Sequence, residues 1–256
     1  MTARKRHLVQ ETAGPSGPPP QLSIIIPMYN EEEGVEHTVE QVAATLRDGF
    51  HEGTWEIIIV NDGSRDKTWE KANALAEQPG REYLHVLGYA RNRGRGYALR
   101  TGFDAARGEW ICSIDADLTY SPDQILGLTA ILRDEPDVDL ALASAYMPGG
   151  VVENAPLVRL LSSKIGNTIL SWFMSPAGHK LYTITCVFRA YRRHVLESLA
   201  LESDGKDIHL EILSKAIMLG FVYREIPATV KARTRGKSKF RFKNTATSHL
   251  IFALFE

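Results

Sequence analysis

Short apolar runs alternate along the first half of the chain with longer segments whose apolar residues recur at helical spacing. The runs are rich in β-branched residues and predict strands buried on both faces, at 22–27, 55–60, 83–87 and 110–114. The segments between them predict helices at 31–47, 67–77 and 94–107. Because strand and helix alternate, the predicted fold class is α/β, with a mostly parallel central sheet flanked by helices.

The second half continues this pattern less regularly, with strands predicted at 138–143 and 221–226 and helices at 122–134, 156–174, 192–200 and 207–219. No linker interrupts residues 21–230, so this stretch is predicted to be one domain. Residues 1–20 are expected to form a disordered basic leader, because 14–20 are glycine and proline apart from one serine. Residues 231–256 form a third segment, basic at first and apolar near its end.

Three polar clusters directly follow predicted strands, at 27–31, 61–64 and 115–119. Ligands of open α/β sheets bind outside the carboxyl ends of the strands. We therefore expect the three clusters to lie at one edge of the sheet and to form the functional site.

Asp115 and Asp117, separated by Ala116, end one of these strands. Such a pair can hold Mg²⁺ or Mn²⁺, hard cations that prefer carboxylate oxygens and can bridge a diphosphate. The cation would offset the charge that develops on a departing nucleoside diphosphate. So short a pattern can also be interpreted as a turn with two solvated acids. Because Asp115 and Asp117 directly follow an apolar strand, the metal-binding interpretation is favoured.

The remaining motifs are less specific. Residues 61–64 also fit a strand-to-helix turn, and 27–31 fit a turn followed by helix-favouring acids. Asn92-Arg93-Gly94-Arg95-Gly96 predicts backbone amides at a helix start, with arginines beside them, that suit a phosphate. Its glycine spacing does not match the dinucleotide fingerprint, and the chain has no Gly-Lys-Ser/Thr of a P-loop, so a Rossmann dehydrogenase or an NTPase is not supported.

Composition sets the broad class. Hydrophobic residues make up 44% and charged residues 24%, as in ordinary globular proteins, and the net charge of -1 gives no sign of nucleic-acid binding. Cys112 and Cys186 lack a CxxC spacing and are expected to be reduced thiols of a cytosolic protein. No stretch reaches the roughly 18 apolar residues of a membrane span, so the protein is expected to be cytoplasmic, either soluble or peripheral.

Taken together, the motifs resemble those of the family 2 glycosyltransferases with the GT-A fold. They occur in that family's order and approximate spacing: Pro27-x-Tyr29-Asn30-Glu31, Asn61-Asp62-Gly63-Ser64, Asn92-x-Gly94-x-Gly96 and Asp115-Ala116-Asp117. The resemblance covers about residues 22–240 and is greatest to the dolichol-phosphate mannose synthases and their bacterial polyprenyl-phosphate relatives. It implies a metal-dependent, inverting hexosyltransferase that uses a nucleotide sugar.

The resemblance also implies roles for individual residues. The donor nucleotide would be held by Pro27, Tyr29, Glu31, Val60 and Asp62. The metal and the diphosphate would be held by Asp115 and Asp117, with Ala116 and Thr119 nearby. Phosphate groups would contact Arg159 and Ser163, and a mobile Arg233-x-x-Gly236-x-Ser238-Lys239 stretch would close over them. Residues 188–191 match a segment near the donor sugar, and Glu211 matches a glutamate on the following helix.

This sequence departs from the motifs of the related synthases in two places, both in the part that would bind the donor sugar and the acceptor. Ala143-Ser144-Ala145-Tyr146 stands where the synthases usually have Gly-Ser-Arg-Tyr, so Ala145 removes a cation expected near the phosphates. Residues 183–189 stand where they usually have Asp-Leu-Thr-Ser-Gly-Phe-Arg, and here the acid and the glycine are replaced by Thr183 and Val187. These departures leave open a third hypothesis, a non-catalytic nucleotide-binding scaffold on the same fold.

The acceptor decides which chemistry the site needs. A phosphate acceptor needs no general base, because its second pKa of about 6 leaves it largely ionised near neutral pH. The enzyme need only align the reactants and stabilise charge. The candidates for this catalytic work are Asp117, Arg159, Arg189 and Arg233. A sugar or lipid hydroxyl needs a base, and Asp207 is the candidate, although an acid at that position also suits the start of a helix.

The C-terminal stretch predicts the location. Residues 231–243 carry a run of Lys and Arg without an acid, interleaved with Phe240 and Phe242, and apolar residues follow at 250–255. This pattern suits an anionic membrane surface and a polyprenyl-phosphate acceptor at the inner face of the membrane. The alternatives are that the basic run binds only the nucleotide's phosphates and that the apolar end packs on the domain. GDP-mannose is the first expected donor, and UDP-glucose is the second.

Overall fold

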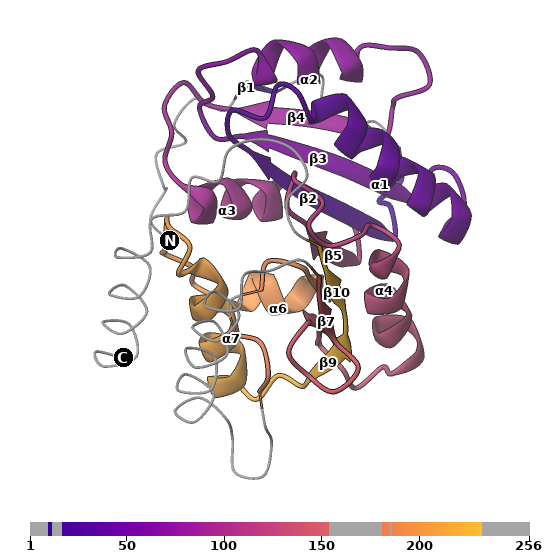
Figure 1. Cartoon of the computed structure of the whole chain (residues 1–256), viewed down its shortest axis with the longest axis vertical. Coiled ribbons are helices and arrows are strands. Elements are labelled where there is room, and N and C mark those ends of the chain that lie inside the picture. The colour runs from indigo at the N-terminus through magenta and orange to yellow at the C-terminus, as the bar shows by residue number, and fades with distance from the viewer. Residues whose placement is uncertain (1–9, 12–16, 154–180, 185, 232–256) are drawn as a thin grey trace.

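An eight-stranded sheet with the order β1-β4-β3-β2-β5-β8-β6-β9 organises the chain (Figure 1). This computed structural model describes residues 10–11, 17–153, 181–184 and 186–231. The strands are β1 (Gln10–Glu11), β2 (Leu22–Met28), β3 (Trp55–Asn61), β4 (Leu84–Gly88), β5 (Trp110–Ser113), β6 (Leu140–Ser144), β8 (Arg189–Arg192) and β9 (Tyr223–Pro227). β4, β3, β2 and β5 are parallel neighbours, and β9 is parallel to β6. β8 runs antiparallel between β5 and β6.

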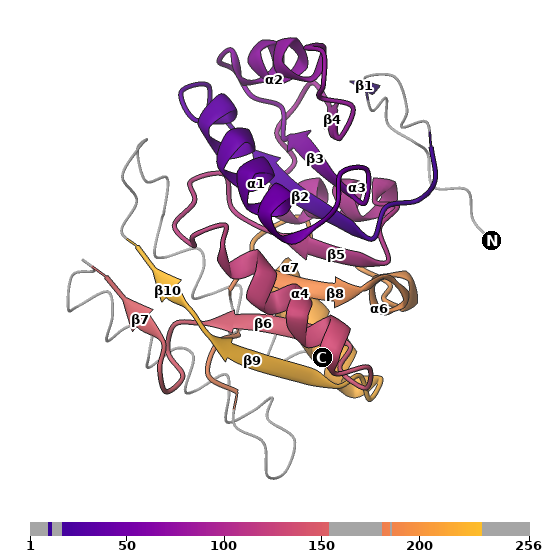
Figure 2. The ribbon, with the colours of Figure 1, turned by 90° about the vertical axis from the view of Figure 1, so that its right-hand side faces the viewer.

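Helices cover both faces of the sheet and give three layers (Figure 2). One face carries α1 (Val35–Gly49), α2 (Thr68–Ala76) and α4 (Gln124–Asp134). The other carries α3 (Arg95–Ala105), α6 (Arg193–Ser198) and α7 (Ile208–Met218). Successive strand residues point to opposite faces, so Ile24 and Ile26 enter the core under α1 while Ile25 enters the core under α3. Because both faces are covered, β2 is apolar along nearly its whole length.

Most predicted elements are confirmed, with small shifts at their ends. This holds for the six predicted strands and for the predicted helices that the structure describes. The helix predicted at 156–174 lies outside the described residues. The mostly parallel α/β architecture is therefore the one that alternating apolar patterns indicate.

The structure corrects the sequence-based predictions in three places. Gln10 and Glu11, expected to belong to a disordered leader, form β1 and pair antiparallel with Gly88 and Leu87 of β4. β8 was not predicted, because a run of two arginines, alanine and tyrosine shows no apolar alternation. A small parallel pair, β7 (Val151–Val152) with β10 (Thr229–Val230), was too short to produce a pattern.

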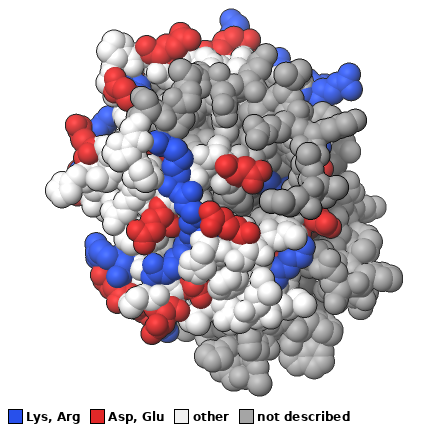
Figure 3. Space-filling view, turned by 180° about the vertical axis from the view of Figure 1, so that it is seen from behind, with Lys and Arg blue, Asp and Glu red and all other residues white. Residues whose placement is uncertain are grey.

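Other expectations concern the cysteines, the membrane and surface charge. Cys112 and Cys186 are buried free thiols. Among the described residues, no helix is long and apolar enough to cross a bilayer. Seen from behind, a band of basic side chains has acidic side chains beside it (Figure 3). Charges of both signs thus share this face, in keeping with a net charge of -1.

A buried ionic cluster lies at the start of β3. Glu56, only 1% exposed, accepts a hydrogen bond from Ser23 Oγ (2.6 Å). It also accepts bonds from the backbone N–H of Arg107 (2.9 Å) and from Nη2 of its guanidinium (3.0 Å). Nε2 of His85 lies 3.5 Å from the same carboxylate. Burial lowers the pKa of His85, an effect that Glu56 opposes and Arg107 reinforces.

This lowered pKa makes stability depend on pH. As the pH falls below 6.5, the ordinary pKa of histidine, the unfolded chain binds a proton at position 85 before the folded protein does. The free energy of unfolding is therefore expected to decrease, by at most about 1.4 kcal/mol per pH unit for this group. Urea denaturation between about pH 5 and 8 measures the slope. His85→Gln should flatten it, whereas His37→Gln, at an exposed position on α1, should not; equal slopes in the two variants would contradict the prediction.

Candidate active site

The carboxyl ends of β2, β3 and β5 lie side by side, because these strands are parallel neighbours in the order β3-β2-β5. The register pairs Met28 with Asn61 and Ile25 with Ser113. The backbone N–H of Asp62 continues this contact by donating to the carbonyl of Met28 (2.8 Å). The three polar clusters that follow the strands are thus brought to one edge, where open α/β sheets bind ligands.

The turn after β2 is fastened to the turn after β3. The backbone N–H of Asn30 donates to Ser64 Oγ (2.9 Å), and that of Glu31 donates to Thr68 Oγ1 (2.8 Å). Asn30 has a positive φ of 52°, a conformation that asparagine adopts more readily than most residues. The structure places three predicted nucleotide-binding residues, each partly exposed, at this edge: Pro27, Tyr29 and Glu31.

Two other predicted site residues are instead fully buried. The side chain of Val60 packs in the core under α3, and a contact of this residue with the nucleotide stays a prediction. Arg189 in β8 donates from Nη1 to the carbonyl of His209 (2.7 Å) and from Nη2 to the carbonyl of Ile184. This guanidinium is buried in the described structure, where it fastens β8 to α7 and to the segment that precedes β8. Its catalytic role stays a prediction.

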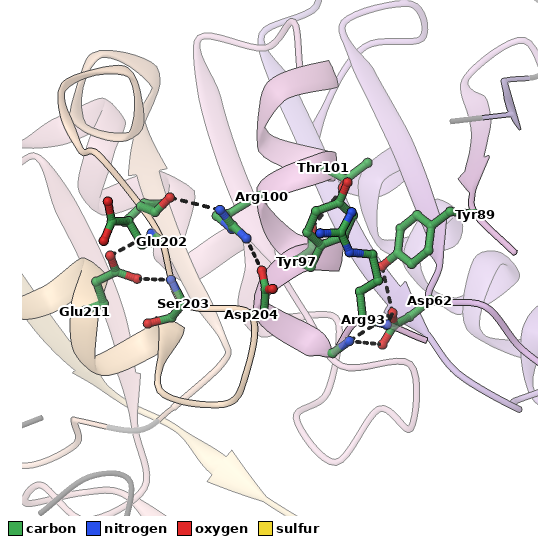
Figure 4. Close-up of polar contacts among 12 residues, drawn as sticks. Asp62, Tyr89, Arg93, Tyr97, Arg100, Thr101, Glu202, Ser203, Asp204 and Glu211 are labelled. Carbon is green, nitrogen blue, oxygen red and sulfur yellow. Dashed lines mark hydrogen bonds and ion pairs between the residues drawn. The ribbon is translucent and has the colours of Figure 1, made fainter. Parts of the chain in front are cut away.

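Asp62 shapes the segment that follows β4. Its carboxylate, in a residue only 4% exposed, accepts a bond from Tyr89 Oη (2.8 Å; Figure 4) and another from Asn92 Nδ2 (2.8 Å). It also accepts the backbone N–H groups of Arg93 (2.8 Å) and Gly94 (3.1 Å). Burial raises the pKa of Asp62, and these bonds act in the opposite direction. In the described structure Asp62 stabilises this turn through these hydrogen bonds. Its contact with a nucleotide remains a prediction.

The amino end of α3 is capped by a distant part of the chain. The backbone N–H groups of Gly96 (2.8 Å) and Tyr97 (3.3 Å) both donate to the carbonyl of Asp204. A Cβ on Gly96 would collide with the backbone of Ser203 and Asp204, so glycine permits this close approach. The prediction that these amides bind a phosphate is therefore wrong for the described structure, since Asp62 and Asp204 already accept them.

Side chains of α3 strengthen the same contact. Arg100 pairs with the Asp204 carboxylate and donates from Nη1 to the carbonyl of Leu201 (3.1 Å). The guanidinium of Arg93 lies over the ring of Tyr97, with Cζ 3.6 Å from the ring centroid. Figure 4 shows these residues in line from Asp62 to the 201–205 loop.

Glu211 of α7 fixes the 201–205 loop from its other side. This residue is 2% exposed, and its carboxylate accepts the N–H groups of Glu202 (2.8 Å) and Ser203 (2.9 Å) (Figure 4). It also pairs with Lys215 Nζ at 2.7 Å. Although burial alone would raise the pKa of Glu211, the bonds from Lys215, Ser203 and Glu202 hold it below its ordinary value. The loop is thus held between α3 and α7.

Asp207, the predicted base, lies two residues beyond this loop. It is partly exposed at the residue before α7, and its backbone oxygen accepts the N–H of Glu211 (2.9 Å). The fastened loop therefore gives Asp207 a defined place, while its role as a base remains a prediction.

The turn after β5 carries the two predicted metal ligands, Asp115 and Asp117, both partly exposed. Thr38 of α1 donates to the carbonyl of Ala116 between them (2.7 Å). The N–H of Thr119 donates to Asp117 Oδ1 (3.1 Å). These contacts hold the backbone of the turn and leave both carboxylates close to the surface.

This turn fits a divalent cation. Mg²⁺ is usually bound through one or two carboxylates together with substrate phosphates, and Asp115 and Asp117 supply such a pair. Among the described residues, no group of three His, Cys, Asp or Glu side chains gathers as a metal site. A cation at this pair could take further oxygens from a diphosphate and from water. Nη2 of Arg95, the first residue of α3, lies 3.1 Å from Asp115 Oδ1 and adds a positive charge to the turn.

The last described residues lie beside the same turn. The N–H of Lys231 donates to the carbonyl of Thr119 (2.8 Å), and Val230 forms a bridge with Tyr120. Arg233 follows two positions later in the sequence. The predicted phosphate-binding stretch thus begins two residues after a backbone bond to the Asp117 turn.

A profile of known protein families matches residues 23–200, well over half of the chain, and is described as glycosyl transferase family 2. This chain belongs to glycosyl transferase family 2. A dolichol-phosphate mannosyltransferase of Pyrococcus furiosus is 34% identical over 223 residues, which are 87% of this chain and 60% of that protein. A polyprenol monophosphomannose synthase of Mycolicibacterium smegmatis is 34% identical over 241 residues, which are 89% of this chain and 83% of that protein. This family 2 chain thus spans about three fifths of the length of the Pyrococcus relative.

Solved structures share the fold at low identity. Glucosyl-3-phosphoglycerate synthase of Mycobacterium tuberculosis, in complex with Mn²⁺, UDP and phosphoglyceric acid, aligns with a TM-score of 0.68 at 18% identity over 92% of this chain and 77% of that chain. A mannosyltransferase from Pyrobaculum calidifontis, in complex with GDP-Man and Mn²⁺, aligns with a TM-score of 0.58 at 18% identity. The alignment covers 91% of this chain and 62% of that chain. The GT-A fold implied by the motifs is confirmed.

The acceptor end of this family 2 glycosyltransferase is less completely described. The predicted residues outside the described part are Arg159, Ser163, Arg233, Gly236, Ser238, Lys239 and the apolar 250–255. Ala145 and Val187, which replace an arginine and a glycine of the related synthases, are buried. Thr183, which replaces an aspartate, lies with its hydroxyl 2.6 Å from that of Ser144.

The structure also assigns contacts that sequence reasoning missed. The sequence shows Arg95 only as one of the arginines near a predicted helix start, and nothing in it points to the contact with Asp115. Nothing in the sequence points to Asp204 either, because its partners Gly96 and Arg100 lie more than a hundred residues earlier. The small residues Gly94 and Gly96 were the available signal, since they mark a close backbone approach.

Proposed function

We propose that this glycosyltransferase transfers a sugar from a nucleoside diphosphate sugar to a polyprenyl phosphate, with inversion at the anomeric carbon. The observation that carries the proposal is the gathering of Asp115, Asp117 and Arg95 beside the Tyr29–Glu31 turn, at the carboxyl edge of the parallel strands. The names of two relatives, a dolichol-phosphate mannosyltransferase and a polyprenol monophosphomannose synthase, support the class of acceptor.

The donor would bind across the ends of β2, β3 and β5. Pro27, Tyr29 and Glu31 are proposed to hold the nucleoside, which their partly exposed side chains at this edge support, and Asp62 would complete their site. Asp115 and Asp117 would hold Mg²⁺ or Mn²⁺, which offsets the charge of the departing diphosphate when bound. GDP-mannose is the first proposed donor, because the relatives' names specify mannose. UDP-glucose is the second, because a structural neighbour contains UDP.

The acceptor phosphate would approach the anomeric carbon from the side opposite the diphosphate. Being ionised, it needs alignment and charge stabilisation rather than proton removal. Arg159 and Arg233 are proposed for this work, with Ser163 and Lys239 beside the phosphates. Thr119 supports that arrangement, because it bonds Lys231 at the beginning of the basic stretch.

The basic residues of 231–243 and the apolar 250–255 are proposed to contact an anionic membrane surface at the cytoplasmic face. A membrane-bound polyprenyl phosphate would then meet the site without leaving the bilayer. Sedimentation with vesicles that contain an anionic phospholipid, compared with neutral vesicles, tests this part of the proposal.

A hydroxyl acceptor is the second candidate. It is favoured by the position of Asp207, which follows a loop fixed by both Glu211 and the amino end of α3. A carboxylate held in this way could accept the proton of a sugar or lipid hydroxyl. The phosphate acceptor is preferred because the relatives' names point to it.

Incubation of the purified protein with Mn²⁺ or Mg²⁺, a polyprenyl phosphate and one donor at a time tests the proposal. The expected result is a glycolipid of the predicted mass with GDP-mannose, with the anomeric configuration inverted by NMR. Product only from a hydroxyl acceptor would favour the second candidate, and nucleotide binding without any transfer would favour a scaffold. Absence of nucleotide binding would overturn the proposed donor site altogether.

Asp207→Asn separates the two acceptors. Transfer to a phosphate should stay within a few-fold of the wild-type rate, since no base is needed. Transfer to a hydroxyl should fall by roughly 100- to 10,000-fold. Donor binding, measured in parallel, should be unchanged in both cases.

A further inference from the structure

The position of Arg95 is fixed from both sides. The N–H of the preceding residue, Gly94, donates to the Asp62 carboxylate, and the N–H of the following residue, Gly96, donates to the carbonyl of Asp204. Asp62 and Asp204 are themselves held by neighbouring segments, as Figure 4 shows. The backbone of Arg95 is therefore held rigidly at the first position of α3.

This backbone places the Arg95 side chain against the candidate metal site. Nη2 lies 3.1 Å from Asp115 Oδ1, with the arginine side chain 35% and the aspartate side chain 19% exposed. The backbone N–H groups of Gly94, Gly96 and Tyr97 are bonded to Asp62 or Asp204. The guanidinium is thus the part of this helix start that reaches the acidic turn.

We propose that Arg95 is a resident counter-ion of Asp115 that makes binding of the divalent cation dependent on the nucleotide. The inference rests on the proposed function, because it assumes that Asp115 and Asp117 hold Mg²⁺ or Mn²⁺. A cation that arrives alone competes with Arg95 for the Asp115 carboxylate and is repelled by the positive guanidinium nearby. A nucleoside diphosphate brings negative charge that offsets the charges of both the metal ion and the Arg95 guanidinium. Its oxygens also complete the coordination of the metal ion.

Two results follow from this arrangement. The protein without nucleotide binds the divalent cation weakly, and a nucleoside diphosphate strengthens that binding. By linkage, the cation strengthens nucleotide binding by the same factor. Arg95 sets part of this coupling, because its charge penalises the state in which the cation is present without the diphosphate.

Titration of Mn²⁺, followed by the electron paramagnetic resonance of free Mn²⁺, tests the proposal without any turnover. Wild type, Arg95→Gln and Arg95→Ala are compared in the absence and presence of GDP, and then of UDP. Both neutral variants should bind Mn²⁺ alone about fivefold more tightly than wild type, the size expected for a partly exposed ion pair. Their gain in Mn²⁺ affinity on adding nucleotide should shrink. Thermal unfolding confirms that each variant is folded, and either neutral variant suffices if the other is not.

Arg95→Lys and Arg93→Gln are the matched controls. Lysine keeps the positive charge at position 95 and should keep the nucleotide dependence of wild type. Arg93 stacks on Tyr97 and is two residues away, so neutralising it should leave Mn²⁺ binding unchanged. Unchanged or weaker Mn²⁺ binding in the neutral Arg95 variants would overturn the inference while leaving the proposed function standing. Wild-type protein that binds neither Mn²⁺ nor nucleotide would overturn both.

Discussion

Asp117→Ala is expected to lower the rate of sugar transfer by roughly 100- to 1000-fold, because one of the two carboxylates proposed for the cation is lost. Stabilisation of a departing diphosphate by a metal contributes several kcal/mol, and each 1.4 kcal/mol is a factor of ten in rate. The side chain is partly exposed and its described bond is to the N–H of Thr119, so the fold should be retained. Steady-state rates over a series of Mn²⁺ concentrations measure the effect.

Asp134→Ala is the matched control for this variant. Asp134 is an exposed acid at the end of α4 that pairs with its neighbour Arg133. Its removal should leave the rate and its dependence on Mn²⁺ unchanged. A rate for Asp117→Ala within a few-fold of the control would remove Asp117 from the proposed metal site.

Asp62→Ala is expected to lower the free energy of unfolding by about 3 kcal/mol and to weaken nucleotide binding. The lost carboxylate accepts two backbone N–H groups and two side-chain donors, and hydrogen bonds to charged groups contribute about 1.5–3 kcal/mol each without adding fully. The desolvation that raises the pKa of Asp62 opposes these bonds, so the net loss is smaller than their sum. Urea denaturation gives the change in stability, and calorimetric titration with GDP and UDP gives the change in affinity.

Asp48→Ala provides the comparison. Asp48 is an exposed residue in the last turn of α1, and its removal should change stability by less than about 0.5 kcal/mol. Equal denaturation midpoints for the two variants would mean that the 89–94 turn does not depend on Asp62.

The sheet was largely predictable because its parallel strands are covered on both faces. Residues such as Ile24, Ile25 and Ile26 are all buried and therefore form an unbroken apolar run. The same logic predicted that the turns after β2, β3 and β5 share an edge, since parallel neighbours end together. β8 escaped prediction because Arg189 and Arg192 look like surface residues until their partners are known. Those partners are backbone carbonyls: Ile184 lies five residues before Arg189, whereas His209 and Val138 belong to more distant segments.

The candidate site was predicted less completely because local sequence does not reveal long-range partners. Gly94 and Gly96 resemble a phosphate-binding helix start, and only the folded chain shows Asp62 and Asp204 bound to their amides. Arg95 could be identified as a helix-start arginine, but its contact with Asp115 depends on how α3 packs on β2 and β3. Sequence thus predicts which residues lie near a ligand site more readily than it predicts which atoms those residues contact.

The insertion of β8 between β5 and β6 also constrains the order in which the chain can assemble during synthesis. β2, β3, β4 and β5 follow one another along the sequence, and their pairing can be completed once residue 113 has left the ribosome. The outer edge of β5 must then wait for its partner, since Trp110 pairs with Arg192 and Ser113 with Arg189. Until that later segment is made, the nascent chain presents an unpaired, apolar strand edge of the kind that associates with other chains. Translation pauses between these two points would therefore favour aggregation or chaperone binding.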